Sequence, residues 1–296
     1  MESALGGGVV SGRGGRVLAY DQVGDPAGAP IICLHGTPGS RLSGRHPRPE
    51  RVVAAGLRLI TYDRPGYGRS DRQAGRRVVD CAADVATLAD HLELERFAVN
   101  GGSGGGPHAL AVGARLPERV TRVGCDVGVA PFDASDLDWL AGMDPVNVRE
   151  TNWALAGEQT LTKELEQEAR RALERVDRDP TALFQTIELS ASDRAVLADS
   201  GVREVLRAAV REMFAQGVSG WVDDDLALIS PWGFEVEELT VPVDISYGRE
   251  DVLVPSSHGE WLARHIPHAS VTIAEDAGHL SLPDHRLERL GALLRP

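Results

Sequence analysis

The chain lacks long apolar runs and any excess of positive charge. No stretch of its 296 residues approaches the about 20 consecutive apolar residues that a membrane-spanning helix needs. Lysine and arginine together number 31, against 44 aspartate and glutamate residues, which gives a net charge of −13. Phosphate-rich partners call for a basic surface, so this balance argues against nucleic-acid binding, and it also disfavours anionic membranes.

Cysteine is scarce as well. The three cysteines, Cys33, Cys81 and Cys125, are far apart, and no C-x-x-C pair suggests a metal site or a redox motif. An odd number of dispersed thiols fits a reducing compartment. Residues 1–8 have neither a basic segment nor an apolar segment, so we predict no signal peptide and a cytoplasmic location.

Short apolar runs and helix-like segments alternate along much of the chain. Between residues 78 and 94, apolar side chains recur at spacings of three and four, which predicts an amphipathic helix. Strand-like runs are predicted at residues 16–20, 31–34, 57–62, 97–101, 120–127, 241–247 and 269–274. Strands separated by helices indicate an α/β fold with a mostly parallel sheet covered on both faces.

The pattern changes in the middle of the chain, where strand-like runs disappear. We therefore predict a helical cap at residues 131–231, inserted between a first core part at 1–130 and a second at 232–296. Trp139, Trp153 and Trp221 fall in this cap. Their wide aromatic surfaces are candidates for lining a pocket, although packing the cap against the core is an equally good role for each.

A glycine-rich run at residues 100–106 follows one strand-like run and precedes a helix-like segment. Within it, residues 101–105 read Gly-Gly-Ser-Gly-Gly and fit G-x-S-x-G, the sharp turn that exposes a nucleophilic serine at the end of a strand. Glycines suit this turn because a Cβ on either side of the serine would clash. The alternative is a flexible loop with an incidental serine, in a chain with 33 glycines. Ser103 is the candidate nucleophile.

A serine hydroxyl needs a base to accept its proton and a third group to orient that base. Asp251 and His279 each follow a late strand-like run, in the chain order serine, acid, histidine. Both would then lie at the sheet edge where active-site loops gather. Other carboxylates remain open for the role of the acid: Glu250, Asp126 and Asp133.

Nine histidines compete for the role of base. His108 lies in the helix after the serine and is predicted to pack there, and four others are expected at the surface, in or beside helices: His258, His265, His268 and His285. His279, in a loop between the last strand and the last helix, is the best placed.

The loop His-Gly-Thr-Pro-Gly-Ser at residues 35–40 follows the second strand-like run and is placed to supply an oxyanion donor. Pro38 has no N–H, so we predict the Thr37 amide as one donor and the Gly104 amide as the other. His35 is then expected to hold the loop rather than act as the base. The charges of the glycine-rich turn at 63–70 are expected to stabilise that turn.

Taken in order, these motifs resemble the α/β-hydrolase superfamily over nearly the whole chain. The shared features are the His-Gly-x-Pro-Gly loop, the Asp-Arg-Pro-Gly-Tyr-Gly-Arg-Ser turn, the G-x-S-x-G elbow, the Gly-Arg-Glu-Asp segment and the late Gly-His pair. The resemblance implies the α/β-hydrolase fold, with an eight-stranded, mostly parallel sheet, an inserted helical cap, and no metal or organic cofactor.

Within this superfamily, the sequence resembles capped esterases and the proline-iminopeptidase-like branch. Members of that branch usually carry a bulky residue such as Trp after the serine and a glycine where Thr37 stands. Here Gly104 follows the serine, which puts a peptidase assignment in doubt. We expect the missing side chain to leave room for substrate beside the nucleophile.

These observations predict a serine hydrolase that cleaves an ester, lactone or thioester of a small, largely apolar molecule through an acyl-enzyme on Ser103. The alternatives are a non-hydrolytic lyase or cyclase on the same fold, an aminopeptidase of the proline-iminopeptidase type, and a ligand-binding protein with a vestigial triad. The expected partner is a small-molecule substrate, and a monomer and a homodimer fit the sequence equally well.

Overall fold

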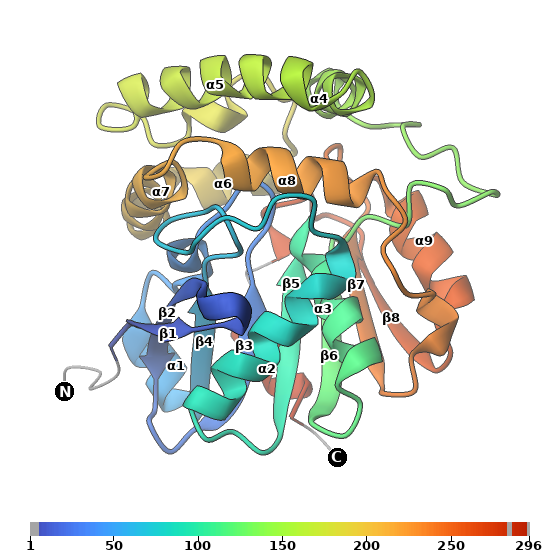
Figure 1. The fold of residues 1–296 in the computed structure, drawn as a ribbon. Coiled ribbons are helices and arrows are strands. Elements are labelled where there is room, and N and C mark those ends of the chain that lie inside the picture. The colour runs from blue at the N-terminus through green and yellow to red at the C-terminus, as the bar shows by residue number, and fades with distance from the viewer. Residues whose placement is uncertain (1–5, 283–285, 295–296) are drawn as a thin grey trace.

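A computed structural model describes residues 6–282 and 286–294 of the chain. Its centre is one eight-stranded sheet in the order β1-β2-β4-β3-β5-β6-β7-β8 (Figure 1). The strands β1 and β4 pair antiparallel with β2, and all other neighbours pair parallel. The strands are β1 Gly8–Ser11, β2 Val17–Gly24, β3 Ala29–Leu34, β4 Leu57–Tyr62, β5 Phe97–Gly102, β6 Val120–Asp126, β7 Val243–Gly248 and β8 Ala269–Ala274.

Helices cover both faces of this sheet, and successive residues of a strand face opposite layers. In β3, Ile32 and Leu34 pack in the layer that holds α2, α3 and α9, whereas Ile31 and Cys33 pack in the layer that holds α1 and α10. Apolar residues on both sides explain why the central strands read as continuous apolar runs. These helices are α1 Pro49–Ala54, α2 Cys81–His91, α3 Gly105–Arg115, α9 Ser256–His265 and α10 Arg286–Ala292.

Five helices are inserted between β6 and β7, and Figure 1 shows them above one end of the sheet. They are α4 Pro145–Leu155, α5 Glu158–Arg175, α6 Ala191–Ala198, α7 Ser200–Met213 and α8 Ser219–Leu228. They form a small apolar core of their own, in which α5, α7 and α8 also enclose Tyr67 from the turn after β4. We call this insert the cap; the boundaries drawn from the sequence at 131 and 231 stay a prediction.

The predicted fold class is confirmed, and the differences are local. The strand β1 was not predicted, because two of its neighbours are glycines and its four residues form a strand only by pairing with β2. The strand β6 ends at Asp126 rather than at Val127, whose φ of 45° breaks the extended backbone. Within the described residues, no helix is long and apolar enough to cross a membrane.

Candidate active site

The turn at Ser103 joins β5 to α3 and is tightly constrained by glycines. Ser103 has a φ of 54°, in the left-handed region that L-residues seldom adopt. A Cβ on Gly101 would lie 2.0 Å from the Gly105 carbonyl oxygen, and a Cβ on Gly105 would lie 2.4 Å from the Leu34 carbonyl oxygen. Both positions therefore require glycine, and the strained turn presents the serine side chain above the sheet.

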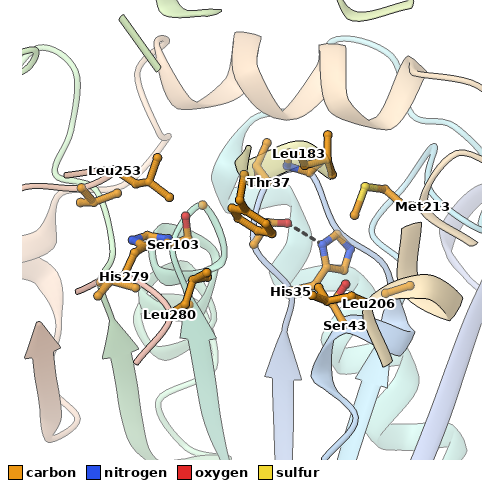
Figure 2. A pocket seen from close by; sticks show the side chains of 18 of the residues that line it. His35, Thr37, Ser43, Ser103, Leu183, Leu206, Met213, Leu253, His279 and Leu280 are labelled. Carbon is orange, nitrogen blue, oxygen red and sulfur yellow. Dashed lines mark hydrogen bonds between the residues drawn. The ribbon is translucent and has the colours of Figure 1, made fainter. Parts of the chain in front are cut away.

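His279 and Asp251 form a hydrogen-bonded pair beside this serine. The His279 Nδ1 lies 2.8 Å from the Asp251 Oδ2, and Figure 2 shows the imidazole next to the Ser103 side chain. The Asp251 Oδ1 accepts hydrogen bonds from the amides of Leu253 and Val254, which fix the carboxylate. Burial lowers the pKa of His279, but the carboxylates of Asp251 and Asp193 together more than offset this and hold that pKa above its usual value.

The other candidate acids lie elsewhere. Glu250 and Asp133 are exposed, and Asp126 accepts hydrogen bonds from Asn100 and Arg289. Among these four carboxylates, in the described part of the chain, only Asp251 hydrogen-bonds the His279 ring. The geometry therefore favours Asp251 as the acid over the three alternatives.

Of the five other histidines that the sequence analysis placed, one needs a correction. His108 is buried in α3 as predicted, and His268 is exposed. His258, expected at the surface, is fully buried: its Nδ1 accepts from the Ala130 amide and its Nε2 donates to the Trp139 carbonyl. Burial lowers the pKa of His258 to about 4, so it stays neutral. His265 is half-buried against Trp261, and His285 lies outside the described residues.

The loop after β3 lies against the serine turn. A Cβ on Gly36 would touch the Ser103 Cβ at 3.4 Å, which places the loop's backbone beside the candidate nucleophile. The His35 Nε2 accepts a hydrogen bond from the Arg64 amide, and its Nδ1 donates to the Gly36 carbonyl. Burial holds the pKa of His35 well below its usual value, so the geometry agrees with a structural role.

The expectation of spare room at Gly104 is wrong. A Cβ on Gly104 would lie 2.4 Å from the Thr37 Oγ1 and 2.8 Å from the Thr37 Cβ, so the threonine side chain already fills that space. The Thr37 amide nitrogen, at 3.3 Å from the same added Cβ, lies close to Gly104, as two oxyanion donors should.

A cavity of about 950 Å³ opens over this site, between the sheet and the cap. Ser103 and His279 lie at its floor. Figure 2 shows Leu253 and Leu280 beside them, and Leu183, Leu206 and Met213 across the cavity on the side of His35. Its size is that of a small-molecule site. The three predicted tryptophans, Trp139, Trp153 and Trp221, are all among the lining residues.

The α/β-hydrolase fold family model matches residues 29–286 of this chain. The chain belongs to that family. The chain is 26% identical to the pimeloyl-[acyl-carrier protein] methyl ester esterase of Nitrosomonas europaea, over 90% of this chain and 96% of that protein. It is equally 26% identical to the proline iminopeptidase of Xanthomonas citri, over 93% of this chain and 91% of that one.

Solved structures of the family share this fold. The enol-lactonase of Burkholderia xenovorans LB400 superposes with a TM-score of 0.66 and 23% identity, covering 97% of this chain and 99% of that one. An esterase from Exiguobacterium antarcticum gives a TM-score of 0.66 at 19% identity, over 97% of each chain. At these identities the likeness establishes the fold alone.

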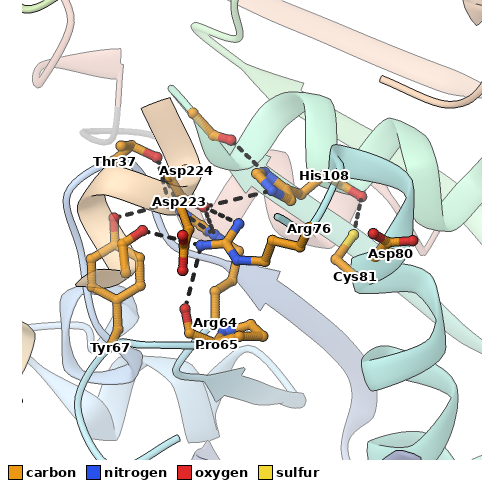
Figure 3. A network of polar contacts seen from close by, with 12 residues as sticks. Thr37, Arg64, Pro65, Tyr67, Arg76, Asp80, Cys81, His108, Asp223 and Asp224 are labelled. Atoms are coloured by element: carbon orange, nitrogen blue, oxygen red, sulfur yellow. Dashed lines mark hydrogen bonds and ion pairs between the residues drawn. The ribbon is translucent and has the colours of Figure 1, made fainter. Parts of the chain in front are cut away.

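The site of this α/β-hydrolase-fold protein includes a buried ion network that its sequence did not reveal. Asp224 of α8 accepts hydrogen bonds from Arg64, Arg76, Tyr67 and Thr37, at 2.5, 2.6, 3.0 and 2.8 Å (Figure 3). Burial alone would raise the pKa of Asp224, but the two guanidinium groups hold it well below its usual value. The network joins the cap to the loop that carries the Thr37 amide.

The wall of the cavity also holds a pair of acids, the half-buried Glu150 of α4 and the buried Asp225 of α8. The Trp221 indole donates to the Glu150 Oε1 at 2.7 Å. Burial raises the pKa of Glu150 to about 7, and burial together with the Glu150 charge raises the pKa of Asp225 well above its usual value. Two carboxyl groups this close do not both ionise, so near neutral pH the pair retains a proton.

Proposed function

We propose that the protein is a serine hydrolase that cleaves an ester, lactone or thioester of a small, largely apolar molecule through an acyl-enzyme on Ser103. The observation that carries this proposal is the 2.8 Å contact between His279 and Asp251, next to a serine on a strained turn at the floor of the cavity. A base oriented by a buried carboxylate is what an otherwise unreactive hydroxyl needs.

Each residue of the site has a distinct role in the proposed reaction. The neutral His279 ring accepts the Ser103 proton as the oxygen attacks the acyl carbon, and Asp251 stabilises the imidazolium that forms. The amides of Thr37 and Gly104 bind the developing oxyanion. His279 then returns the proton to the leaving group, activates a water molecule, and so releases the acyl group from Ser103.

The apolar lining supports an apolar acyl or alcohol group in the substrate. Leucine side chains lie beside Ser103 and His279, and further leucines and a methionine line the cavity across from them. Binding an apolar group against these side chains is favourable because it removes apolar surface from water. An esterase of the same family at 26% identity, and an enol-lactonase of the same fold, are consistent with this class of substrate.

A second candidate is hydrolysis of an amide or ester that lies next to an amino group. The Glu150–Asp225 pair in the cavity wall favours it, because a cationic group in the substrate would compensate the negative charge that remains on the pair when it holds one proton. Family members at 26% identity include a proline iminopeptidase.

A panel of chromogenic substrates tests the proposal. It comprises p-nitrophenyl esters with acetyl, hexanoyl, benzoyl and succinyl groups, a lactone, a thioester, and an aminoacyl p-nitroanilide. We expect turnover of the uncharged acyl groups, with hexanoyl preferred over succinyl. Faster cleavage of the aminoacyl anilide than of every ester would favour the second candidate, and turnover of none of the panel would contradict both.

The pH profile of ester hydrolysis is expected to have an acidic limb. His279 acts as a base only when neutral, so kcat/KM should fall with unit slope as the pH drops through its pKa, which lies above the ordinary 6.5. Glu150, whose pKa is about 7, lies in the same cavity. The variant Glu150→Gln separates the two: a limb that persists supports His279, and a limb that vanishes contradicts it.

Adding a methyl group at position 104 is expected to disturb the oxyanion loop. In Gly104→Ala, the new Cβ collides with the Thr37 side chain. Overpacking of about 1–3 kcal/mol, carried over to the transition state, corresponds to a loss of roughly 5- to 150-fold in kcat/KM. The matched control is Gly102→Ala, whose Cβ would meet only the Asp126 carbonyl oxygen, at 3.8 Å.

The double variant completes this test. Thr37→Gly removes both atoms that the new Cβ would strike, so adding Gly104→Ala to Thr37→Gly should change kcat/KM by less than about twofold. An equal loss with and without Thr37 would show that the collision is not the cause.

A further inference from the structure

Asp193, in the first turn of α6, is a buried carboxylate that binds the backbone of the His279 loop. Asp193 is only 1% exposed to solvent. Its Oδ2 accepts from the His279 amide at 2.9 Å, and its Oδ1 accepts from the amides of Leu280 and Ser281 at 2.9 and 2.8 Å. One cap side chain thus satisfies three successive donors of a loop 86 to 88 residues away.

The loop and the cap fit closely around this carboxylate. The Ser281 Oγ donates to the Ser192 Oγ at 3.0 Å and accepts from the Gly278 amide at 2.8 Å. A Cβ on Gly278 would lie 2.3 Å from the Asp193 Oδ2, so only glycine allows the loop to approach. The position of the His279 backbone is therefore set by contacts with α6.

Capping of α6 does not explain these contacts. Residues 190–193 read Ser-Ala-Ser-Asp, a capping-box pattern in which the acid would bond the amide of the N-cap residue. Ser190 does cap the helix, since its Oγ accepts from the Asp193 amide at 3.0 Å. The Asp193 carboxylate, however, bonds the His279 loop instead of the start of its own helix.

Two carboxylates act electrostatically on the His279 ring. Asp251, from the loop after β7, hydrogen-bonds the ring, and Asp193, from α6, acts through space. Burial lowers the pKa of His279 and both carboxylates raise it. The removal of either negative charge would therefore make the ring a weaker base.

We propose that Asp193 is a positioning residue: by binding three backbone amides it holds the His279 ring between Asp251 and Ser103, so that a docked cap is required for a competent base. This inference rests on the proposed serine-hydrolase function. Asp193 does not touch the reacting atoms; it acts through the histidine. The cap then assembles the catalytic machinery in addition to forming the cavity roof.

The variant Asp193→Asn tests the proposal, because an amide keeps the shape but loses the charge and one acceptor. We expect hydrogen exchange of the amides of residues 279–281 to accelerate at least about tenfold. We expect kcat for a p-nitrophenyl ester to fall roughly 10- to 100-fold, since small misplacements of a catalytic group have effects of this size, with KM within about twofold. The acidic limb of the kcat/KM profile should move to lower pH.

Ser190→Ala is the matched control. It removes the hydrogen bond that caps α6 and the 2.9 Å contact between the Ser190 and Ser192 hydroxyls, but it leaves the Asp193 carboxylate and its three amide partners in place. Exchange within α6 should accelerate, while kcat and the acidic limb should stay as in the wild type. Gly278→Ala is a second way to break the hydrogen bonds between Asp193 and the His279 loop, because its Cβ pushes the carboxylate away without removing it.

Unchanged exchange at residues 279–281 in both Asp193→Asn and Gly278→Ala would overturn the proposal, whatever the activity. A fall in kcat and a shift of the limb in Ser190→Ala equal to those in Asp193→Asn would also overturn it, since stability of α6 would then be the cause. If the wild type hydrolyses no ester, the proposed function fails, and the exchange measurement still tests Asp193 separately.

Discussion

Ser103→Ala is expected to lower kcat for ester hydrolysis by about 10⁴-fold or more, because the residues of a triad act as a unit. Without the hydroxyl, His279 has no proton to accept and no acyl-enzyme forms. The cavity walls and both amide donors remain, so KM for the residual reaction should change by less than about threefold. Steady-state kinetics with the best ester of the panel measure both quantities.

A serine in the same cavity provides the control. Ser43 also lines the cavity, and its Oγ accepts a hydrogen bond from the Ser40 amide. Ser43→Ala should retain kcat within about threefold, since the nearby His35 has both ring nitrogens hydrogen-bonded to backbone and is not available as a base. Equal losses in the two variants would point to disturbed folding rather than to a missing nucleophile.

Asp224→Ala is expected to destabilise the fold by about 3–5 kcal/mol, the usual effect of removing one partner from a buried ion pair. Arg64 has a fully buried side chain and that of Arg76 is 3% exposed, so both guanidinium charges would lose their partner away from water. Thr37 and Tyr67 would each lose a hydrogen bond at the same time. We expect the melting temperature to fall by roughly 10 °C.

An exposed ion pair is the comparison for this loss. Asp90 of α2 pairs with Arg119 but is 70% exposed, so Asp90→Ala should change the free energy of unfolding by less than about 1 kcal/mol. Chemical denaturation of both variants gives the two values. A melting temperature of Asp224→Ala within about 2 °C of the wild type would show that the network does not hold the cap to the core.

The parts of the site that the sequence predicts share one property: each is a short motif at the carboxyl end of a parallel strand. Ser103 follows β5, Asp251 follows β7 and His279 follows β8, so the order of the strands brings them to the same edge of the sheet. Glycine spacing and chain order therefore sufficed to select them from many serines, acids and histidines.

The contacts between cap and core could not be predicted in this way. Asp193 and Asp224 lie on cap helices, where a carboxylate suggests a solvent-facing position, and their partners are 86 or more residues distant. The prediction of free space beside Gly104 was wrong for the same reason, because the side chain that fills this space comes from the loop after another strand. Such pairings depend on how the cap docks, which no local pattern encodes.

Two buried aspartates give the cap a direct influence on the site. Asp224 holds the loop that carries the Thr37 amide, and Asp193 holds the loop that carries His279. The proposed oxyanion donor and the proposed base are thus both tied to helices of the insert. In this account, changes in cap packing alter the rate of reaction as well as the choice of substrate.

The most direct test of the central claim is to react the protein with a fluorophosphonate and to locate the adduct by tandem mass spectrometry. Such a reagent phosphonylates a serine whose oxygen is activated by a neighbouring base, with release of fluoride. The account predicts one adduct per chain, on Ser103, and none in Ser103→Ala. An adduct on another residue, or full labelling of Ser103→Ala, would contradict it.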